Sequence, residues 1–221
     1  MQEHYDRQLE ENIILSELHA ITVCPNCRRP AQPEFIVCAH CATPLQDRIF
    51  GHKTLRACPN CRFVQHNDPK VAVVARIEHD NCLLLVRRGV NPGKGLWALP
   101  GGYMDGGEMP VDAVIREITE EVALPIVVHE LVAIYPMVNH EQPSQGIVIV
   151  YRAVPADPHC STAVAPPALD DVAEARWFPV QELAGELPVT LAFASTEVEV
   201  RRWVEATARR AITSFSKESD L

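Results

Sequence analysis

The 221 residues have an ordinary globular composition: 47% are hydrophobic, 22% are charged, and the formal net charge is −9 at pH 7. No apolar run is long enough to span a membrane and no basic-then-apolar leader opens the chain, so we expect a cytoplasmic protein that is neither membrane-inserted nor exported. The acidic balance disfavours sequence-blind binding to nucleic acid, but it does not exclude a polyphosphate substrate held through a metal ion.

The first 21 residues are predicted to form a helix that packs on a neighbouring surface. Tyr5, Leu9, Ile13 and Leu18 fall at helical spacing, and glutamate and glutamine fill many of the other positions. We therefore treat residues 1–21 as a segment of its own.

Residues 22–69 carry six of the eight cysteines and few apolar side chains. A segment with so few apolar side chains to bury needs a cross-link, such as a bound metal ion or disulfides, in order to fold. Because the six cysteines form three C-x-x-C pairs in a chain without a secretion leader, they are typical of metal knuckles rather than of disulfides. A structural zinc site takes four thiolates, usually from two knuckles, so three pairs leave a choice. The pairs are Cys24/Cys27, Cys38/Cys41 and Cys58/Cys61.

Two ways of pairing the knuckles stay open on these residues alone. Ten residues separate the first pair from the second, and sixteen separate the second from the third; both spacings suit a compact zinc ribbon. His40 and His52 would extend the set of ligands, but the sequence favours surface positions for both. In either pairing four thiolates close the coordination shell, which predicts a structural rather than a catalytic zinc ion.

Residues 70–212 show mixed strands with interspersed helices, a pattern that indicates one domain of the α+β class. The domain opens with "KVAVVARIE" and "NCLLLVRRG", which are predicted to form a β-hairpin in which Cys82 is a small buried hydrophobe. "LWALPGG" is predicted to be a short strand that runs into a glycine turn. Further strands are expected near "VHELVAIYP", "GIVIVYRAV" and "EARWF", a short helix at "PVQELAG", an amphipathic helix over residues 191–210, and a flexible tail over residues 213–221.

The segment from Pro110 to Val122 is predicted to be a helix with proline in its first turn. A spacing of about 100° per residue puts its apolar side chains on one face, which should be the core side, and three glutamates on another. Like charges at this spacing repel each other, so they either point into water or hold a cation. The apolar residues are Val111, Val114, Ile115, Ile118 and Val122, and the acidic ones are Glu117, Glu120 and Glu121.

A glycine turn at Gly101 and Gly102 and the acidic Glu108 lie just before this helix. Carboxylates that converge from a helix and a glycine loop suit a hard divalent cation such as Mg²⁺ or Mn²⁺. A bound cation would also remove the repulsion within the acidic group. The sequence therefore favours a metal site over a solvated acidic surface.

The stretch from Gly102 to Leu124 resembles the Nudix box, G-x5-E-x7-R-E-U-x-E-E-x-G-U, in which U is apolar. One defined position differs, because Ala123 stands in place of the second glycine. A left-handed cap after the helix would cost alanine about 1 kcal/mol, without removing a side chain used in catalysis. The matching residues after Gly102 are Glu108, Arg116, Glu117, Ile118, Glu120, Glu121 and Leu124.

The resemblance to the Nudix family implies an α/β/α sandwich with a mixed sheet, and a hydrolase of nucleoside diphosphates linked to another moiety. It implies that Glu117 and Glu121 ligate Mg²⁺ or Mn²⁺ and that Glu120 is a ligand or the base. Arg116 would hold the carboxylates in place.

Three further roles follow from the same resemblance. Glu108 would act in the outer shell of the metal site, and the carbonyl of Gly101 would add a ligand. Glu174, in "VAEARWF", stands where related pyrophosphatases carry a further acidic residue, although a salt-bridging surface glutamate fits that position equally well.

Some Nudix proteins carry a zinc ribbon just ahead of the catalytic domain, and "RACPNCRFVQHNDPKVAVV" is similar to that junction. We therefore favour zinc ligation by Cys38, Cys41, Cys58 and Cys61, with Cys24 and Cys27 as the alternative pair. Ribbon-bearing members include NADH and FAD pyrophosphatases. The former carry an SQPWPFPQS array that "YPMVNHEQPSQGIVIVY" lacks, so ADP-ribose, FAD or another dinucleotide is the expected substrate.

Three other functions remain open at this point. The protein could be a nucleoside triphosphate pyrophosphohydrolase, a nucleotide-sensing module, or a protein whose zinc ribbon binds capped RNA. Trp97, Tyr103 and Tyr135 are candidates to stack on a nucleobase, although packing in the core or at the rim is favoured for each. Many enzymes of this fold dimerise, so a homodimer is expected by analogy.

Overall fold

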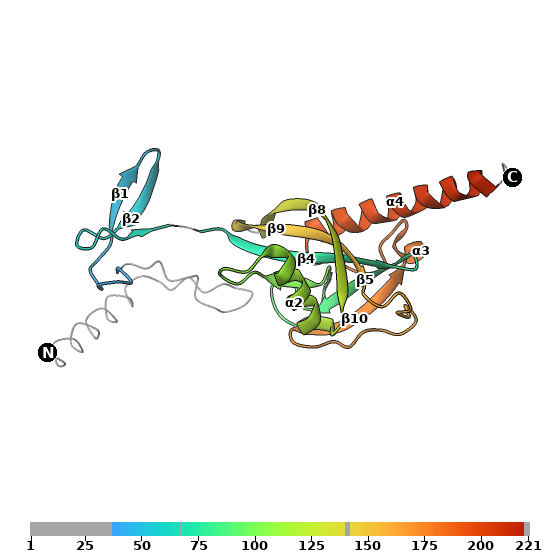
Figure 1. Ribbon diagram of the computed structural model, residues 1–221. Helices are drawn as coiled ribbons and strands as arrows, with labels where there is room; N and C mark the ends of the chain where they lie inside the picture. Colours follow the sequence, from blue (N-terminus) through green and yellow to red (C-terminus); the bar gives the residue numbers. More distant parts are fainter. Residues whose placement is uncertain (1–36, 67, 140–141, 219–221) are drawn as a thin grey trace. The chain divides into compact units, whose positions relative to one another are not determined.

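The computed structural model describes the backbone of residues 37–66, 68–139 and 142–218 (Figure 1). The chain divides into two compact units between residues 67 and 68, and each unit is described by itself. The helix predicted over residues 2–21 and the pair Cys24 and Cys27 lie outside the described residues. Within the described part, no helix combines the length and apolarity needed to cross a membrane.

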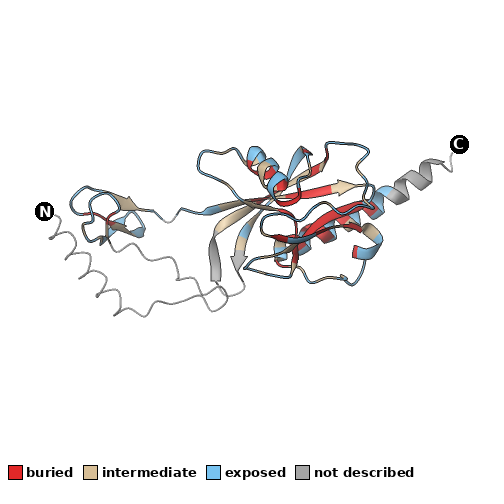
Figure 2. Ribbon diagram, turned by 90° about the horizontal axis from the view of Figure 1, so that it is seen from below, coloured by how far each residue is buried: buried red, intermediate tan, exposed pale blue. Residues whose placement is uncertain are grey.

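The first unit contains a small antiparallel sheet in the order β1-β2-β3. Strand β1 spans Gln46–Phe50, β2 spans Lys53–Ala57, and the two-residue β3 spans Val64–Gln65. Among the described residues of this unit only Cys38, Ala57 and Cys58 are buried, and Figure 2 shows the exposed colour over most of the rest. So little apolar burial does not stabilise a fold of this size, which supports the prediction that this unit needs a cross-link such as a bound metal ion.

The second unit opens with the predicted hairpin of β4, Lys70–His79, and β5, Cys82–Arg88. The turn residues Asp80 and Asn81 both have positive φ, at 46° and 58°, as a type I′ hairpin turn requires. The strands pair next to the turn and then separate, because β4 continues against β7 and β9 while β5 continues against β6 and β10. The backbone of the glycine turn is thereby placed between the diverging strands.

The complete sheet has seven strands in the order β10-β5-β4-β9-β8, with β6 beside β5 and β7 beside β4. It is mixed, because β4 and β9 run parallel and the other pairs run antiparallel. This confirms the mixed α+β architecture expected from the sequence. The remaining strands are β6 (Trp97–Ala98), β7 (Gly101–Tyr103), β8 (Ile126–Asn139), β9 (Gln142–Pro155) and β10 (Val172–Pro179).

Helices cover both faces of this sheet (Figure 1). Helix α2, Pro110–Val122, packs on one face, whereas α3, Val180–Leu183, and α4, Ala194–Glu218, pack on the other. Alternate residues of β5 enter the two apolar clusters, which explains the uninterrupted run "CLLLV". Helix α4 continues past its predicted end at residue 210 into the segment expected to be a tail, because no glycine or proline interrupts residues 211–218.

The predicted core face of α2 is partly wrong. Val114, Ile118 and Val122 are fully buried, but Val111 and Ile115 are 39% and 38% exposed. The helix turns the flank that carries Glu121 toward the sheet instead, and Glu121 is only 4% exposed. Burial of a carboxylate in place of two apolar side chains is unfavourable for packing, so the orientation of α2 points to a function of the acid.

Ala123 adopts the left-handed conformation that glycine would favour at this position, with φ 48° and ψ 32°. Its N–H donates to the carbonyl of Thr119 at 3.0 Å and closes the last turn of α2. Glycine reaches this conformation without a Cβ clash, so we expect Ala123→Gly to raise the free energy of unfolding by about 1 kcal/mol. Urea unfolding followed by tryptophan fluorescence measures the effect, and unchanged or lower stability contradicts it.

Candidate active site

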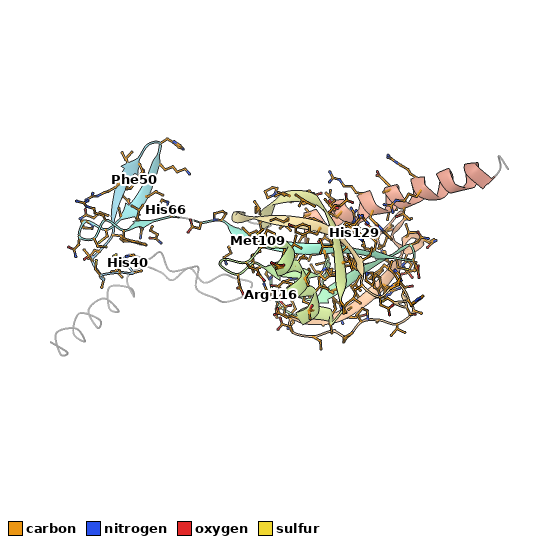
Figure 3. All side chains as sticks on the ribbon, in the orientation of Figure 1. His40, Phe50, His66, Met109, Arg116 and His129 are labelled. Atoms are coloured by element: carbon orange, nitrogen blue, oxygen red, sulfur yellow. The ribbon has the colours of Figure 1, made fainter. Side chains whose placement is uncertain are left out.

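Arg116, labelled in Figure 3, lies on α2, and its guanidinium joins acidic residues of this helix to one in the loop before it. Its Nε and Nη2 donate to both oxygens of Glu108 at 2.9 Å, and its Nη1 donates to Glu117 at 2.8 Å and to Glu120 at 3.0 Å. Nη2 also donates to the carbonyl of Tyr103 at 3.1 Å. One cation thus fixes three carboxylates and the end of β7 relative to each other.

Glu108 lies in the loop before α2 and accepts one further hydrogen bond, from the backbone of its own turn. The backbone N–H of Asp105 donates to Glu108 Oε2 at 3.1 Å. Together with the bonds from Arg116, this holds the pKa of Glu108 below its usual value. Glu108 is therefore ionised at neutral pH and keeps the arginine in a single orientation.

Glu121 is the buried member of the acidic group. Its Oε2 accepts the N–H of Gly101 at 2.8 Å, but burial still raises its pKa from 4.5 to about 8. The nearby charges of Asp171 and Glu117 raise this pKa further, and Arg88 lowers it only in part. A carboxylate held in this way is unfavourable when ionised unless a cation joins it.

Gly102 allows α2 to approach the sheet closely, and Gly101 allows β7 to lie close to β4. A Cβ on Gly102 would lie 2.4 Å from Oε2 of Glu117, and a Cβ on Gly101 would lie 2.2 Å from the carbonyl of Val73. Gly101 also has φ of 138°, a conformation that residues with side chains rarely adopt. The glycine turn therefore provides the cradle in which the carboxylates of Glu117 and Glu121 meet.

Burial raises the pKa of Glu117 as well, and the charges of Glu120 and Asp171 act in the same direction. The donor set is made of oxygens, is partly shielded from water, and carries more negative charge than Arg116 balances. These are the properties that suit Mg²⁺ or Mn²⁺, so the residues present fit the metal that the sequence predicts.

Asp171 is a member of this group that the sequence reasoning missed. Its carbonyl accepts the N–H of Gly89 at 2.6 Å, and the neighbouring Leu169 N–H donates to the carbonyl of Glu121 at 2.8 Å. These two bonds tie the loop before β10 to the end of β5 and to α2. Asp171 follows the Nudix box by about fifty residues and belongs to no motif, so only the fold brings it close to Glu117 and Glu121.

Glu174 and Glu120 are the more exposed of the predicted site residues. Glu174 lies on β10 and accepts a hydrogen bond from Arg87 Nε on β5 at 3.0 Å, a surface ion pair between neighbouring strands. Glu120 contacts Arg116 and otherwise faces solvent, with a side chain 49% exposed. Glu120 is therefore accessible to a ligand without movement of the backbone.

The four cysteines that the sequence favoured come together in the first unit. The ligand atoms of Cys38, Cys41, Cys58 and Cys61 all lie within 4.8 Å of one another. The Sγ atoms of Cys38 and Cys61 are 3.4 Å apart, close to the edge of roughly 3.8 Å expected for a tetrahedron of thiolates around zinc. This geometry fits zinc and matches the favoured pairing.

The two knuckles have similar turns, but the backbone N–H that donates to the first thiol of each pair comes from a different position. The N–H of His40 donates to the Sγ of Cys38, and the N–H of Cys61 donates to the Sγ of Cys58, each at 3.4 Å. The residue after each knuckle, Ala42 or Arg62, has positive φ. His40 is exposed, as predicted, and its ring packs on that of Phe63 with 4.7 Å between the ring centroids (Figure 3).

Comparison with known families identifies residues 66–206 as a NUDIX domain. Over 83 residues the chain is 43% identical to an ADP-ribose pyrophosphatase of Methanocaldococcus jannaschii, covering 38% of this chain and 49% of that protein. Over 150 residues it is 26% identical to a mitochondrial NAD(P)H pyrophosphatase of Mus musculus, covering 68% of this chain and 40% of that protein. The chain thus spans about half the length, or less, of these curated relatives.

Among solved structures, a NUDIX hydrolase from Nitrosomonas europaea superposes with a TM-score of 0.63 at 27% identity. The match covers 76% of this chain and 90% of that structure. The match supports the mixed sheet with its flanking helices as the fold of the second unit.

Proposed function

The chain belongs to the Nudix family, and we propose that it is a metal-dependent hydrolase that cleaves the pyrophosphate linkage of ADP-ribose or a related dinucleotide in the cytoplasm. The observation that carries the proposal is the convergence of Glu117 and the buried Glu121 on the glycine turn. A fold built only for stability gains nothing from a buried carboxylate whose neighbours are also acidic.

In this proposal Glu117 and Glu121 hold Mg²⁺ or Mn²⁺, with the Gly101 carbonyl and Glu120 as further ligands. The metal, when bound, lowers the pKa of a water molecule and neutralises charge on the phosphates. Arg116 positions the carboxylates through its contacts with Glu117 and Glu120.

Glu108 acts on this group through Arg116, to which it makes two hydrogen bonds. We add Asp171 as a further acidic residue beside the metal site, because its charge raises the pKa of both Glu117 and Glu121. Glu120 and Asp171 are the candidates for the base that accepts the proton of the attacking water. Glu174 is a third candidate, and its pair with Arg87 would have to open for that role.

ADP-ribose is the first choice of substrate because the relative from Methanocaldococcus jannaschii is named for it. The relative from Mus musculus is named for NAD(P)H, which contains the same linkage between two nucleoside units. In both compounds hydrolysis at the pyrophosphate gives AMP or its 2′-phosphate and a second monophosphate. All residues named in this proposal come from one chain, and the homodimer expected by analogy stays a prediction.

Chromatography of the products tests the proposal directly. We expect Mg²⁺-dependent release of AMP from ADP-ribose at a higher kcat/KM than from NADH, FAD or a dinucleoside polyphosphate. Release of inorganic pyrophosphate from nucleoside triphosphates would instead support the alternative of a nucleoside triphosphate pyrophosphohydrolase. Nucleotide binding without any turnover would support a nucleotide-sensing module. Hydrolysis of the cap of capped RNA would indicate that the substrate is a nucleic acid.

A further inference from the structure

The first unit has a basic composition within an acidic protein. Residues 37–66 contain four basic side chains and a single acidic one, Asp47, whereas the formal net charge of the whole chain is −9. A basic surface attracts polyanions, so the expectation drawn from the charge of the whole chain does not hold for this unit. The basic residues are Arg48, Lys53, Arg56 and Arg62.

The hairpin of β1 and β2 separates these side chains onto two faces. Residues opposite each other in an antiparallel pair point to the same face, and neighbours along a strand point to opposite faces. The register pairs Phe50 with Lys53 and Arg48 with Leu55. Arg48, Phe50 and Lys53 therefore share one face, which we call the Phe50 face.

The opposite face of the hairpin carries Asp47, Ile49 and Arg56. Its positive charge is balanced, because Nε of Arg56 lies 4.0 Å from a carboxylate oxygen of Asp47. Arg48 and Lys53 are both exposed, and neither forms an ion pair within the described part of the chain. The excess positive charge of the hairpin therefore lies on the Phe50 face.

Phe50, labelled on the hairpin in Figure 3, is the last residue of β1 and is 41% exposed. Arg48 precedes it by two residues on the same strand, about 7 Å away, and Lys53 lies directly opposite it at a Cβ separation of about 5 Å. An aromatic ring between two cations suits a ligand that presents a base between two phosphates.

The zinc cluster does not cancel this charge at the tip of the hairpin. A zinc ion with four thiolates would carry a net charge of about −2. Cys58 directly follows β2, at the opposite end of that strand from Lys53. The length of the strand separates the two ends by roughly 13 Å, which exceeds the Debye length of about 8 Å at physiological ionic strength.

The Phe50 face suits a single-stranded nucleic acid better than other polyanions. An acidic peptide would engage the two cations but would make no use of the ring. An anionic membrane would take up the most exposed apolar side chain of the hairpin, yet that is Ile49, 79% exposed and on the opposite face. In a duplex the bases already stack on one another, whereas a single strand leaves them free to stack on an aromatic ring.

We propose that the Phe50 face binds single-stranded nucleic acid, with a base stacked on Phe50 and phosphates beside Arg48 and Lys53. Neither kind of contact involves the sugar, so RNA and DNA strands serve equally as probes. The inference concerns the first unit alone and goes beyond the proposed hydrolysis, on which it does not depend.

Fluorescence anisotropy of a labelled oligonucleotide tests the inference on the full, zinc-loaded chain. The probe is a single strand of mixed sequence, about 12 nucleotides long, without a pyrophosphate group and in buffer without Mg²⁺. We expect Phe50→Ala to weaken binding about tenfold, and Phe50→Tyr, which keeps the ring, to stay within about twofold of the parent. Arg48→Gln and Lys53→Gln should each lower the slope of log Kd against log salt by about 0.7.

Two control variants remove similar groups from the opposite face. Ile49→Ala deletes the more exposed apolar side chain and should stay within about twofold of the parent. Arg56→Gln removes one positive charge and should keep the parental salt slope. All variants are first checked for retained zinc by mass spectrometry. Equal losses of affinity from variants of both faces would overturn the proposal, because they would indicate unspecific attraction to the unit.

Other ligands give the remaining outcomes. Absence of oligonucleotide binding at low salt, or affinity that no variant of the Phe50 face changes, overturns the inference. A duplex bound as tightly as the single strand would also contradict stacking on Phe50. Tighter binding of polyglutamate, or of vesicles that contain phosphatidylserine, would assign the face to an acidic peptide or a membrane instead. The test involves no turnover, so its result stands whether or not ADP-ribose is cleaved.

Discussion

Glu121→Gln is expected to abolish hydrolysis and, at the same time, to stabilise the protein in the absence of Mg²⁺. Glutamine has the same shape and still accepts the N–H of Gly101, so the glycine turn should keep its geometry. The substitution removes a proposed metal ligand whose contribution to the transition state is several kcal/mol, which corresponds to a loss of about 10³-fold in kcat.

The gain in stability follows from the pKa of Glu121, which is about 8 in the folded chain against 4.5 for an exposed glutamate. Below pH 4.5 the carboxyl group of Glu121 is protonated in both the folded and the unfolded chain, so its burial does not lower the free energy of unfolding through ionisation. Between pH 4.5 and 8 the unfolded chain loses this proton while the folded chain keeps it, so stability falls as the pH rises. The loss at pH 8 is about 4 kcal/mol, and Glu121→Gln should recover most of it.

Unfolding in urea at pH 5 and pH 8 measures this effect, in buffer without Mg²⁺ but without chelator, so that zinc is retained. All three tryptophans lie in the second unit, so their fluorescence reports on the unit that contains Glu121. The variant should be more stable than the parent at pH 8 and nearly equal to it at pH 5. Added Mg²⁺ should stabilise the parent and leave the variant unchanged.

Glu186→Gln, at an exposed position outside the acidic group, is the matched control and should behave like the parent. Hydrolysis by Glu121→Gln at the parental rate would remove this residue from the metal site. A variant that is destabilised equally at both pH values would show that the carboxylate is structural.

The local elements of this protein follow from sequence patterns, whereas the arrangement of the acidic residues does not. The hairpin turn at Asp80 and Asn81 and the helix from Pro110 to Val122 appear where turn chemistry and periodicity placed them. These features depend on neighbours along the chain, which a single sequence displays.

The orientation of α2 depends instead on what lies opposite it. Periodicity identifies Val111 and Ile115 as apolar, but it cannot show that the glycine turn draws the flank with Glu121 inward. Asp171 is a similar case, because its approach depends on contacts with Gly89 and α2 that bridge distant segments. Sequence reasoning found the residues of the box, and the fold decides which of them is buried.

Cys58→Ser is expected to destabilise the first unit strongly, through loss of its zinc ion. The described residues of that unit bury almost nothing apart from Cys38, Ala57 and Cys58. Zinc bound by four thiolates contributes about 10 kcal/mol or more in small metal-dependent domains, far beyond what this burial supplies. Without one thiolate, the sheet of β1, β2 and β3 should lose its zinc and its resistance to protease.

The zinc content of the purified chain, measured by mass spectrometry, is the primary readout. The parent should bind zinc at the described cluster, and Cys58→Ser should lose it. The double variant Cys24→Ser/Cys27→Ser is the matched control, because it removes a C-x-x-C pair that the favoured ligand set does not use. It should retain the zinc bound by Cys38, Cys41, Cys58 and Cys61.

Comparison of these variants decides between the two pairings of the knuckles. Loss of one zinc ion from each variant would mean two separate sites, with Cys24 and Cys27 in the second. Loss from the double variant alone would contradict the cluster of Cys38, Cys41, Cys58 and Cys61. Because every residue of the proposed metal-dependent site lies in the second unit, Cys58→Ser should retain hydrolysis. Retained hydrolysis with an unfolded ribbon would establish zinc as a structural ion, whereas loss of hydrolysis in a folded second unit would tie the ribbon to catalysis.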